Sequence, residues 1–350
     1  MNKIVITTGG TGGHIFPAIS TAKYLIKQKC DLYLLTDNRG LKWSDKNIPI
    51  YNVPSSQILG TSIIGKFKAM FKIIYGFFVA RKHLKKIAPD AIVGFGGYAS
   101  FPVVFAGYSL RIPIILHEQN AYAGLANQML SRFAKIVATA FPKTLALKAK
   151  TVHTGNPIRS EITKLHKNNY PKKDKHINIL ITGGSQGAKI FGEVIPNALL
   201  KYKDKIKITH QVCPEQLEEI KTFYKKHKMN ADVKTFIENI PDVLKNTHLA
   251  ICRSGAGTIM ENSCVGIPTI YVPYKYSANN HQYYNAKSIA DVGGGIIINQ
   301  DDFSQQTLQK TIDSVIVKDN LQQISKCAKS FAVINADELL GNIILENIRK

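Results

Sequence analysis

Three glycine-rich segments hold the residues whose types and spacing suit chemistry on a phosphorylated ligand. They are Gly9-Gly-Thr-Gly-Gly-His14, Gly183-Gly-Ser-Gln-Gly187 and Ser254-Gly-Ala-Gly-Thr258. Glycine-rich turns in front of helices let the backbone approach a ligand and direct N–H groups toward negative charge. One such loop is weak evidence. Two at matching places in the two halves of the chain indicate a cleft that binds a phosphorylated ligand.

His14 and Glu261 are the side chains beside these loops that could act on hydroxyl groups. An imidazole at position 14 could take a proton from an attacking hydroxyl, or it could only cap a helix or bind substrate. Glu261 follows Thr258 by one helical turn, where a carboxylate suits the two hydroxyls of a ribose. The same spacing also fits a threonine helix cap with a glutamate three residues later. Both alternatives stay open at this point.

Two polar segments could add hydrogen-bonding groups to the same site. His117-Glu-Gln-Asn120 follows an apolar run, and polar residues at the carboxyl end of a strand mark the ligand crevice of α/β folds. Asn279-Asn-His-Gln-Tyr-Tyr-Asn285 follows Val272-Pro273 and is dense in donors and acceptors, as sugar recognition requires. Either segment could instead be an ordinary helix start.

The elements that must position these residues repeat in the two halves of the chain. Residues 3–13 and 177–187 each combine a β-branched apolar run with a glycine loop, and helical spacing of apolar residues follows. The first helix would hold Pro17 in its first turn, and Pro196 should bend or restart the second. Strand, loop and helix in this order are how a doubly wound α/β domain begins.

Further apolar runs predict strands at 91–93, 112–116, 136–138, 250–252 and 269–272, with helical patterns between them. The polar segment 164–176 contains a proline and lacks apolar periodicity, so it is interpreted as a linker. The sequence therefore predicts an α/β protein of two doubly wound domains that face each other across a cleft. The uncharged stretch 91–110 is broken by four glycines and a proline, which predicts buried elements and no membrane span.

Composition and charge narrow the compartment and the partners. The chain begins without a signal-peptide pattern, and its five cysteines have no CxxC spacing, which favours a reducing cytoplasm over disulfides or zinc. The net charge is +22, and residues 1–160 hold 21 Lys+Arg against 5 Asp+Glu. A genome that favours lysine explains part of this excess but not its asymmetry. The basic half predicts a polyanionic partner: nucleic acid, an anionic membrane or a phosphorylated substrate.

Residues 58–88 have a composition typical of a membrane-surface helix. Aromatic and aliphatic residues recur at helical spacing from Phe67 to Phe78, and six lysines accompany them. The uncharged run 73–80 is far too short to span a bilayer, but a basic helix with an aromatic stripe can lie on an anionic surface. The alternative is that the stripe belongs to the core and the lysines form a solvated face. The basic first half favours the membrane interpretation.

Taken in order, these segments resemble one bacterial family, the peptidoglycan glycosyltransferases that transfer N-acetylglucosamine to undecaprenyl-diphosphate-linked N-acetylmuramyl-pentapeptide (lipid I), forming lipid II. The resemblance covers nearly the whole chain. It rests on the three glycine-rich segments, His117-Glu-Gln-Asn120 and His281-Gln282, together with Gly94-Phe-Gly-Gly-Tyr98 and Gly155-Asn-Pro-Ile-Arg159. Seven motifs in sequence are highly specific. One departure is Asn280, where relatives often carry an acidic residue.

The resemblance implies a GT-B fold with two Rossmann-like domains. Residues 1–163 would face the acceptor and the membrane, with 336–350 packing back on them, and 164–335 would bind UDP-N-acetylglucosamine. The transfer would invert the anomeric centre without a metal or other cofactor, on the cytoplasmic side of the membrane, for cell-wall synthesis. His14 is the expected general base toward the 4-hydroxyl of the acceptor sugar. The expected donor-site residues are Thr11, Gly12, Gly13, Asn120, Arg159, Ser185, Ile237, Ala256, Gly257, Thr258, Glu261 and Gln282.

Within this set Ile237 would hold the uracil, Glu261 the ribose, and Ser185 with the turn around Ala256 the diphosphate. Gln282 would contact the sugar hydroxyls.

Other functions stay as alternatives. A GT-B glycolipid synthase would keep the fold and use another lipid acceptor, such as diacylglycerol. A nucleic-acid-binding protein is prompted by the pI of about 9.7, but no recognised module is present, so no specific nucleic acid is expected. A nicotinamide-dependent enzyme is weakened by the glycine spacing, which is not GxGxxG. The sequence makes no prediction of the oligomeric state.

Overall fold

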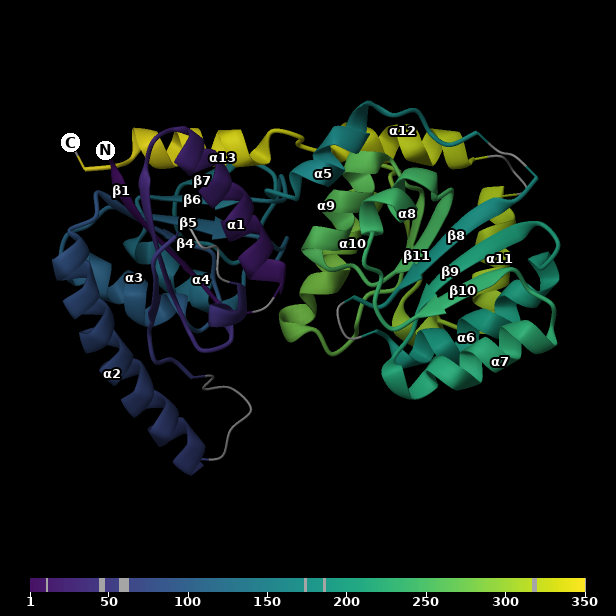
Figure 1. Ribbon diagram of the computed structural model, residues 1–350, viewed down its shortest axis with the longest axis horizontal. Helices are drawn as coiled ribbons and strands as arrows, with labels where there is room; N and C mark the ends of the chain where they lie inside the picture. The colour runs from purple at the N-terminus through teal and green to yellow at the C-terminus, as the bar shows by residue number, and fades with distance from the viewer. Residues whose placement is uncertain are drawn as a thin grey trace. The chain divides into compact units, whose positions relative to one another are not determined.

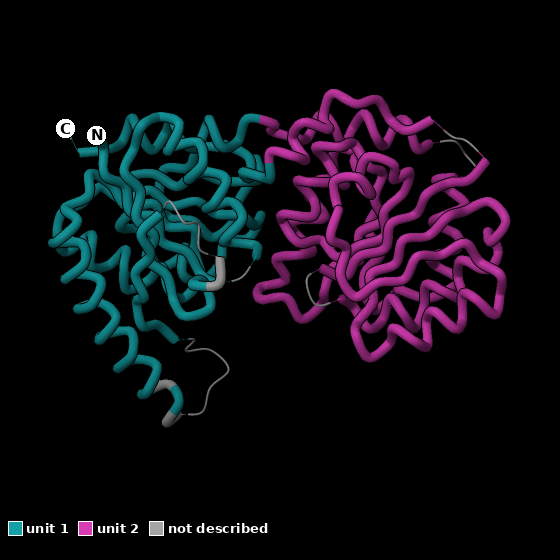
Figure 2. Tube along the Cα trace, viewed as in Figure 1, with its two compact units in different colours: residues 1–159, 335–350 teal, residues 160–334 magenta. Residues whose placement is uncertain are grey.

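The structure is a computed structural model that describes residues 1–10, 12–43, 48–56, 63–172, 175–184, 187–316 and 320–349. The chain divides into two compact units (Figure 2). The N-terminal unit comprises residues 1–159 and 335–350, and the C-terminal unit comprises residues 160–334. Each unit is built on a parallel β-sheet, so the prediction of two doubly wound α/β domains is confirmed.

The N-terminal unit contains a seven-stranded parallel sheet in the order β3-β2-β1-β4-β5-β6-β7. The strands are β1 (Lys3–Thr8), β2 (Asp31–Thr36), β3 (Ile50–Asn52), β4 (Ala91–Gly94), β5 (Ile114–Glu118), β6 (Ile136–Thr139) and β7 (Thr151–His153). The chain reverses its direction of travel across the sheet between β1 and β4. Ligands of doubly wound folds bind at this reversal, beside the carboxyl ends of the strands.

Helices cover both faces of this sheet, which is why its central strands are almost wholly apolar. Ile4 and Ile6 of β1 pack with the first and last helices of the chain, whereas Val5 points to the opposite core. The helices are α1 (Gly12–Lys27), α2 (Ile63–Ile87), α3 (Ser100–Ser109), α4 (Leu125–Leu130) and α13 (Ala336–Glu346). Leu340 and Ile344 of α13 are buried in the same cluster as Leu25 of α1, and Figure 1 shows the two helices together.

The C-terminal unit contains a six-stranded parallel sheet in the order β10-β9-β8-β11-β12-β13. Its strands are β8 (Ile177–Thr182), β9 (Ile206–Gln211), β10 (Ala231–Lys234), β11 (Leu249–Cys252), β12 (Thr269–Tyr271) and β13 (Ile296–Ile297). Its helices are α5 (Ser160–Thr163), α6 (Lys189–Leu199), α7 (Leu217–Lys226), α8 (Ile240–Asn246), α9 (Ala256–Val265), α10 (His281–Ala290), α11 (Gln305–Ile316) and α12 (Leu321–Phe331). The corresponding reversal lies between β8 and β11.

Local expectations differ from the structure at two prolines. Pro196 was expected to bend or restart its helix; the restart is wrong, because α6 continues through Pro196 to Leu199. Pro196 is buried, and tertiary packing routinely overrides local helix propensity. Pro17 lies beyond the first turn of α1, because that helix already begins at Gly12.

The boundary between the units lies slightly before the segment interpreted as a linker. Residues 164–167 form a 3-10 turn of the C-terminal unit. His166 Nδ1 donates to the Cys264 carbonyl at 2.9 Å, and the Tyr170 hydroxyl donates to the His248 carbonyl at 2.8 Å. The polarity of this segment therefore serves hydrogen bonds to its own unit. Within the described ranges, no helix is both long enough and apolar enough to cross a membrane.

Candidate active site

His14 lies in the first turn of α1, at the reversal point of the N-terminal sheet. The loop after β1 is tied to the loop after β4 by a hydrogen bond of 2.9 Å from Gly9 N to the Gly96 carbonyl. Gly97 has a φ of +79°, and a Cβ there would lie only 2.7 Å from Cα of Gly9. The glycines of the Gly94–Tyr98 motif therefore let this loop approach the loop that leads to the half-buried His14.

A chain of hydrogen bonds runs from His14 into the core. His14 Nδ1 lies 2.8 Å from Gln119 Oε1, and Gln119 Nε2 lies 3.0 Å from His117 Nδ1. His117 Nε2 lies 3.1 Å from the Gly155 carbonyl. His117 is completely buried, and this burial lowers its pKa to about 4, so its imidazole is neutral at physiological pH. The His117–Asn120 and Gly155–Arg159 motifs, which are separate in the sequence, thus meet on the buried side of His14.

Glu118 is committed to holding the loop after β5. Its Oε1 accepts from the backbone and side-chain amides of Asn120 at 2.9 and 3.2 Å. Its Oε2 accepts from Gly124 N at 3.0 Å and from Asn127 Nδ2 at 2.8 Å. A buried carboxylate with four such donors stabilises the loop that carries Gln119 and Asn120.

The remaining expected residues of the N-terminal unit lie around the start of α1. Gly12 and Gly13 are its first residues, and a Cβ at Gly13 would meet no atom within 4 Å. The Arg159 guanidinium lies 5.7 Å from the centre of the Phe16 ring on the same helix, a cation–π distance. Thr11 lies outside the described residues.

The C-terminal unit presents its own loops at the carboxyl ends of its strands. Gln211 at the end of β9 donates to the Gly184 carbonyl at 2.9 Å and to the Thr235 carbonyl at 3.4 Å. It therefore links the glycine loop after β8 to the loop after β10, which carries the half-buried Ile237. Ser185 lies outside the described residues.

Helix α9 starts at the reversal point of the C-terminal sheet with Gly255 as its N-cap residue. Gly255 has no side chain, so the cap residue itself cannot occupy the first backbone N–H groups of α9. Thr258 lies inside the helix, so its interpretation as the cap, with Glu261 completing a capping box, is wrong. A Cβ at Gly257 would meet no atom within 4 Å, which leaves space for a ligand at this helix end.

Arg253 is a charged residue of this site that sequence reasoning did not select. Its Nη1 donates to the Val272 carbonyl at 3.0 Å, and its guanidinium lies between the rings of Phe191 and Tyr274 at 5.1 and 5.3 Å. Burial lowers its pKa to about 10, so the group stays cationic at neutral pH. Its position two residues before the N-cap of α9 was visible in the sequence. Its burial among aromatic rings was not.

Gln282 and Ser254 are joined by hydrogen bonds. Ser254 Oγ donates to the Gln282 backbone carbonyl at 2.8 Å, and Gln282 Oε1 accepts from Tyr274 N at 3.0 Å. The side-chain amide oxygen of Gln282 is therefore occupied, and its NH₂ group is the end suited to donate to a sugar hydroxyl. Asn285 Nδ2 holds the Ser254 carbonyl at 3.2 Å.

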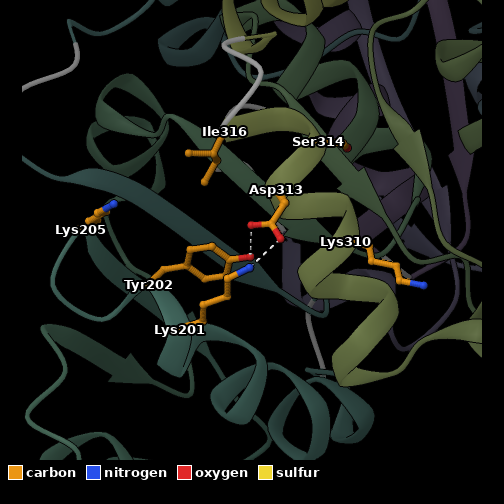
Figure 3. A pocket seen from close by; sticks show the side chains of 7 residues that line it. All are labelled: Lys201, Tyr202, Lys205, Lys310, Asp313, Ser314 and Ile316. Carbon is orange, nitrogen blue, oxygen red and sulfur yellow. Dashed lines mark hydrogen bonds and ion pairs between the residues drawn. The ribbon is translucent and has the colours of Figure 1, made fainter.

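A hollow of about 670 Å³ lies at the opposite, amino edge of the C-terminal sheet (Figure 3). Lys201 and the hydroxyl of Tyr202 hold the Asp313 carboxylate at 2.7 and 2.8 Å, which lowers the pKa of Asp313. These contacts join α11 to the end of α6. None of the expected site residues that the structure describes lines this hollow, so we interpret the cluster as a structural contact between the two helices.

Comparison with known proteins identifies the family. Residues 4–139 match the glycosyltransferase family 28 N-terminal domain, and residues 178–340 match the glycosyltransferase family 28 C-terminal domain. The chain belongs to glycosyltransferase family 28. It is therefore an enzyme that transfers a sugar, as the resemblance implied.

Close relatives of this family 28 chain match it over nearly its full length. It is 36% identical over 353 residues to an Acinetobacter baumannii protein named UDP-N-acetylglucosamine–N-acetylmuramyl-(pentapeptide) pyrophosphoryl-undecaprenol N-acetylglucosamine transferase, covering 97% of this chain and 96% of that one. A Rhodospirillum centenum protein of the same name is 36% identical over 328 residues, covering 90% and 86%. The crystal structure of Acinetobacter baumannii MurG superposes with a TM-score of 0.85 at 33% identity, covering 99% of this chain and 100% of that one. The predicted GT-B fold of two Rossmann-like domains is confirmed.

Proposed function

We propose that this family 28 enzyme transfers N-acetylglucosamine from UDP-N-acetylglucosamine to the 4-hydroxyl of lipid I, forming lipid II. The observation that carries the proposal is the full-length similarity to relatives that are named for this donor and acceptor. The alternative of another lipid acceptor is not favoured, because relatives named for the peptidoglycan acceptor match the chain over both domains.

The C-terminal unit would bind the donor. The N-terminal turn of α9 offers backbone N–H groups and the positive end of a helix dipole to the diphosphate, and Arg253 adds a buried cation next to that turn. Glu261 would accept from the ribose hydroxyls, Ile237 would contact the uracil, and the amide of Gln282 would donate to the sugar. This arrangement would take up the charge of the leaving UDP without a metal ion.

The N-terminal unit would bind the acceptor and supply the base. The acceptor oxygen attacks C1 of the donor sugar, the bond from C1 to the diphosphate oxygen breaks, and UDP leaves. The proton of the attacking hydroxyl passes to His14. Inversion at C1 follows from this single displacement. Gly12, Gly13, Asn120 and Arg159 are the residues of the N-terminal unit that we expect to contact the donor.

Helix α2 would attach the enzyme to the anionic inner face of the membrane. Phe67, Phe71 and Phe78 are 66%, 72% and 62% exposed, so most of the aromatic stripe is not core. Phe77 is the exception, because it is half-buried and packs 5.7 Å from Phe105 of α3. Five exposed lysines share the helix, namely Lys68, Lys72, Lys82, Lys85 and Lys86. Lys66, although expected in this set, has a side chain outside the described part of the chain. Exposed aromatic rings among lysines favour an anionic bilayer surface.

The test is transfer of labelled N-acetylglucosamine to a short-chain lipid I analogue, with diacylglycerol as the competing acceptor. His14→Ala should lower kcat by about 10²–10⁴-fold, as loss of a general base does. Glu261→Ala should raise the donor KM by about 10–100-fold, as loss of a hydrogen bond to a charged group does. Glu219→Ala, an exposed glutamate of α7, is the matched control and should behave as wild type. Turnover with diacylglycerol but not with the lipid I analogue would refute the proposal.

A further inference from the structure

A histidine can act as a general base only through the ring nitrogen that carries the lone pair. In neutral imidazole one nitrogen is protonated and the other is not, and the hydrogen bond made by one nitrogen decides the state of the other. His14 Nδ1 is 2.8 Å from the side-chain oxygen of Gln119. The identity of the atom that faces Nδ1 therefore matters, and it can be derived from the interior outward.

His117, at the inner end of this chain of hydrogen bonds, is completely buried. Because burial lowers its pKa to about 4, His117 carries one ring proton at neutral pH. Its Nε2 faces the Gly155 carbonyl at 3.1 Å, and a carbonyl oxygen can only accept. The proton is therefore on Nε2, and Nδ1 of His117 carries the lone pair. That lone pair requires a donor, and the group 3.0 Å away is the Gln119 amide.

A second carbonyl fixes the same orientation of Gln119. Its Nε2 also lies 3.1 Å from the backbone carbonyl of His117. Turning the amide over would place its oxygen against this carbonyl and against the lone pair of His117 Nδ1. Both contacts would then be acceptor against acceptor inside the core, where an unmade hydrogen bond is costly. The amide NH₂ of Gln119 faces inward, and its oxygen faces His14.

We propose that Gln119 is a positioning residue that holds His14 in the tautomer protonated at Nδ1, so that Nε2 is the atom that receives the proton of the attacking hydroxyl. The inference rests on the proposed function in taking His14 as the base, but the tautomer follows from hydrogen bonds within the N-terminal unit alone. Gly155 and His117 act through Gln119 and need not touch substrate.

The hydrogen bond from His14 Nδ1 to Gln119 Oε1 also forms when His14 is protonated. When Nε2 gains the proton, Nδ1 keeps its own and continues to donate to Gln119 Oε1, so no group has to turn during the reaction. The carbonyl dipole of Gln119 stabilises the imidazolium without adding a charge. A neutral amide thus takes the orienting place that a carboxylate holds in a Ser-His-Asp triad, while Glu118 next to it is committed to the loop.

The test reads the tautomer directly, by ¹⁵N NMR of the histidine ring nitrogens in the full-length enzyme without substrate. The His14 signals are assigned by their loss in His14→Gln. In the neutral imidazole of wild-type His14, we expect a protonated Nδ1 and an unprotonated Nε2. In Gln119→Met, which keeps the length of the side chain but removes the amide, the tautomers should mix. Gln128→Met is the matched control, because Gln128 donates to the Ala123 carbonyl in the same unit.

Kinetics give the second readout. Gln119→Met should lower kcat about 10–100-fold, the range by which loss of the hydrogen-bond partner of a metal-bound histidine lowers activity, and leave the donor KM unchanged. The control should keep both values. A wild-type His14 protonated at Nε2, or a Gln119→Met enzyme with wild-type kcat, would overturn the inference. An enzyme that shows the expected tautomer but transfers no sugar would refute the proposed function and leave the tautomer assignment standing.

Discussion

Replacing Phe71 by alanine should weaken binding to anionic vesicles by an amount that can be worked from its exposure. Full burial of a phenylalanine is worth about 1.5–3 kcal/mol. Phe71 is 72% exposed, so it retains most of that free energy for insertion into the bilayer surface. The expected loss is about 1–2 kcal/mol, or roughly 5–30-fold in the dissociation constant.

The assay is co-sedimentation with vesicles of phosphatidylglycerol and phosphatidylcholine, with no nucleotide sugar present. Phe236→Ala is the matched control, since Phe236 is 67% exposed but lies in a loop of the C-terminal unit. Phe77→Glu would test membrane binding less well than Phe71→Ala, because Phe77 packs into the core and its loss would disturb folding. Each lysine near the surface adds about 1 kcal/mol that salt screens, so binding should fall steeply with ionic strength. Equal loss in Phe71→Ala and Phe236→Ala, or no loss in either, would refute the assignment of α2 to the membrane.

Three further predictions follow from buried groups. The pKa of His117 is lowered to about 4, so between about pH 6.5 and 4 the unfolded state binds more protons than the folded state. The contribution of neutral His117 to the free energy of unfolding is therefore present above this window and is lost as the pH falls through it. Chemical denaturation at pH 7.5 and 5 should show wild type losing about 2 kcal/mol more than His117→Gln; parallel losses would contradict this. Leu340→Ala should lower the free energy of unfolding by about 2–5 kcal/mol, whereas Leu339→Ala should lower it far less, because Leu339 on the same helix is 37% exposed. Equal unfolding midpoints of the two variants would show that α13 is not part of the N-terminal core. Transfer should continue in excess EDTA, because α9 and Arg253 would stabilise the leaving diphosphate; activity abolished by EDTA and restored by Mg²⁺ would reject that role.

The fold could be predicted from the sequence because its cues are local. A parallel strand buried on both faces is a continuous apolar run, and the glycine loop after it marks the ligand edge. The starts of α1 and α9 follow from Gly9–Gly13 and Gly255. Pro196 shows the limit of local cues, since this buried proline lies inside α6 without ending the helix.

The sequence predicted which segments belong to the site but not the contacts between their side chains. His117-Glu-Gln-Asn120 was recognised as polar, yet nothing in the segment shows that Gln119 contacts His14 while Glu118 turns to the loop. That division depends on the register of β5 beside β4 and on alternate side chains pointing to opposite faces. Arg253 was missed for a similar reason, because its aromatic neighbours come from distant segments of the chain.

The most direct test of the central claim is the structure of the product. The enzyme should be incubated with UDP-N-acetylglucosamine and a short-chain lipid I analogue, and the purified product examined by proton NMR and mass spectrometry. The product should carry one added N-acetylglucosamine, joined to the 4-hydroxyl of the acceptor sugar, with the large anomeric coupling of a β-glycoside. Transfer that retains the α configuration, or addition at another hydroxyl, would contradict the single displacement with His14 as base.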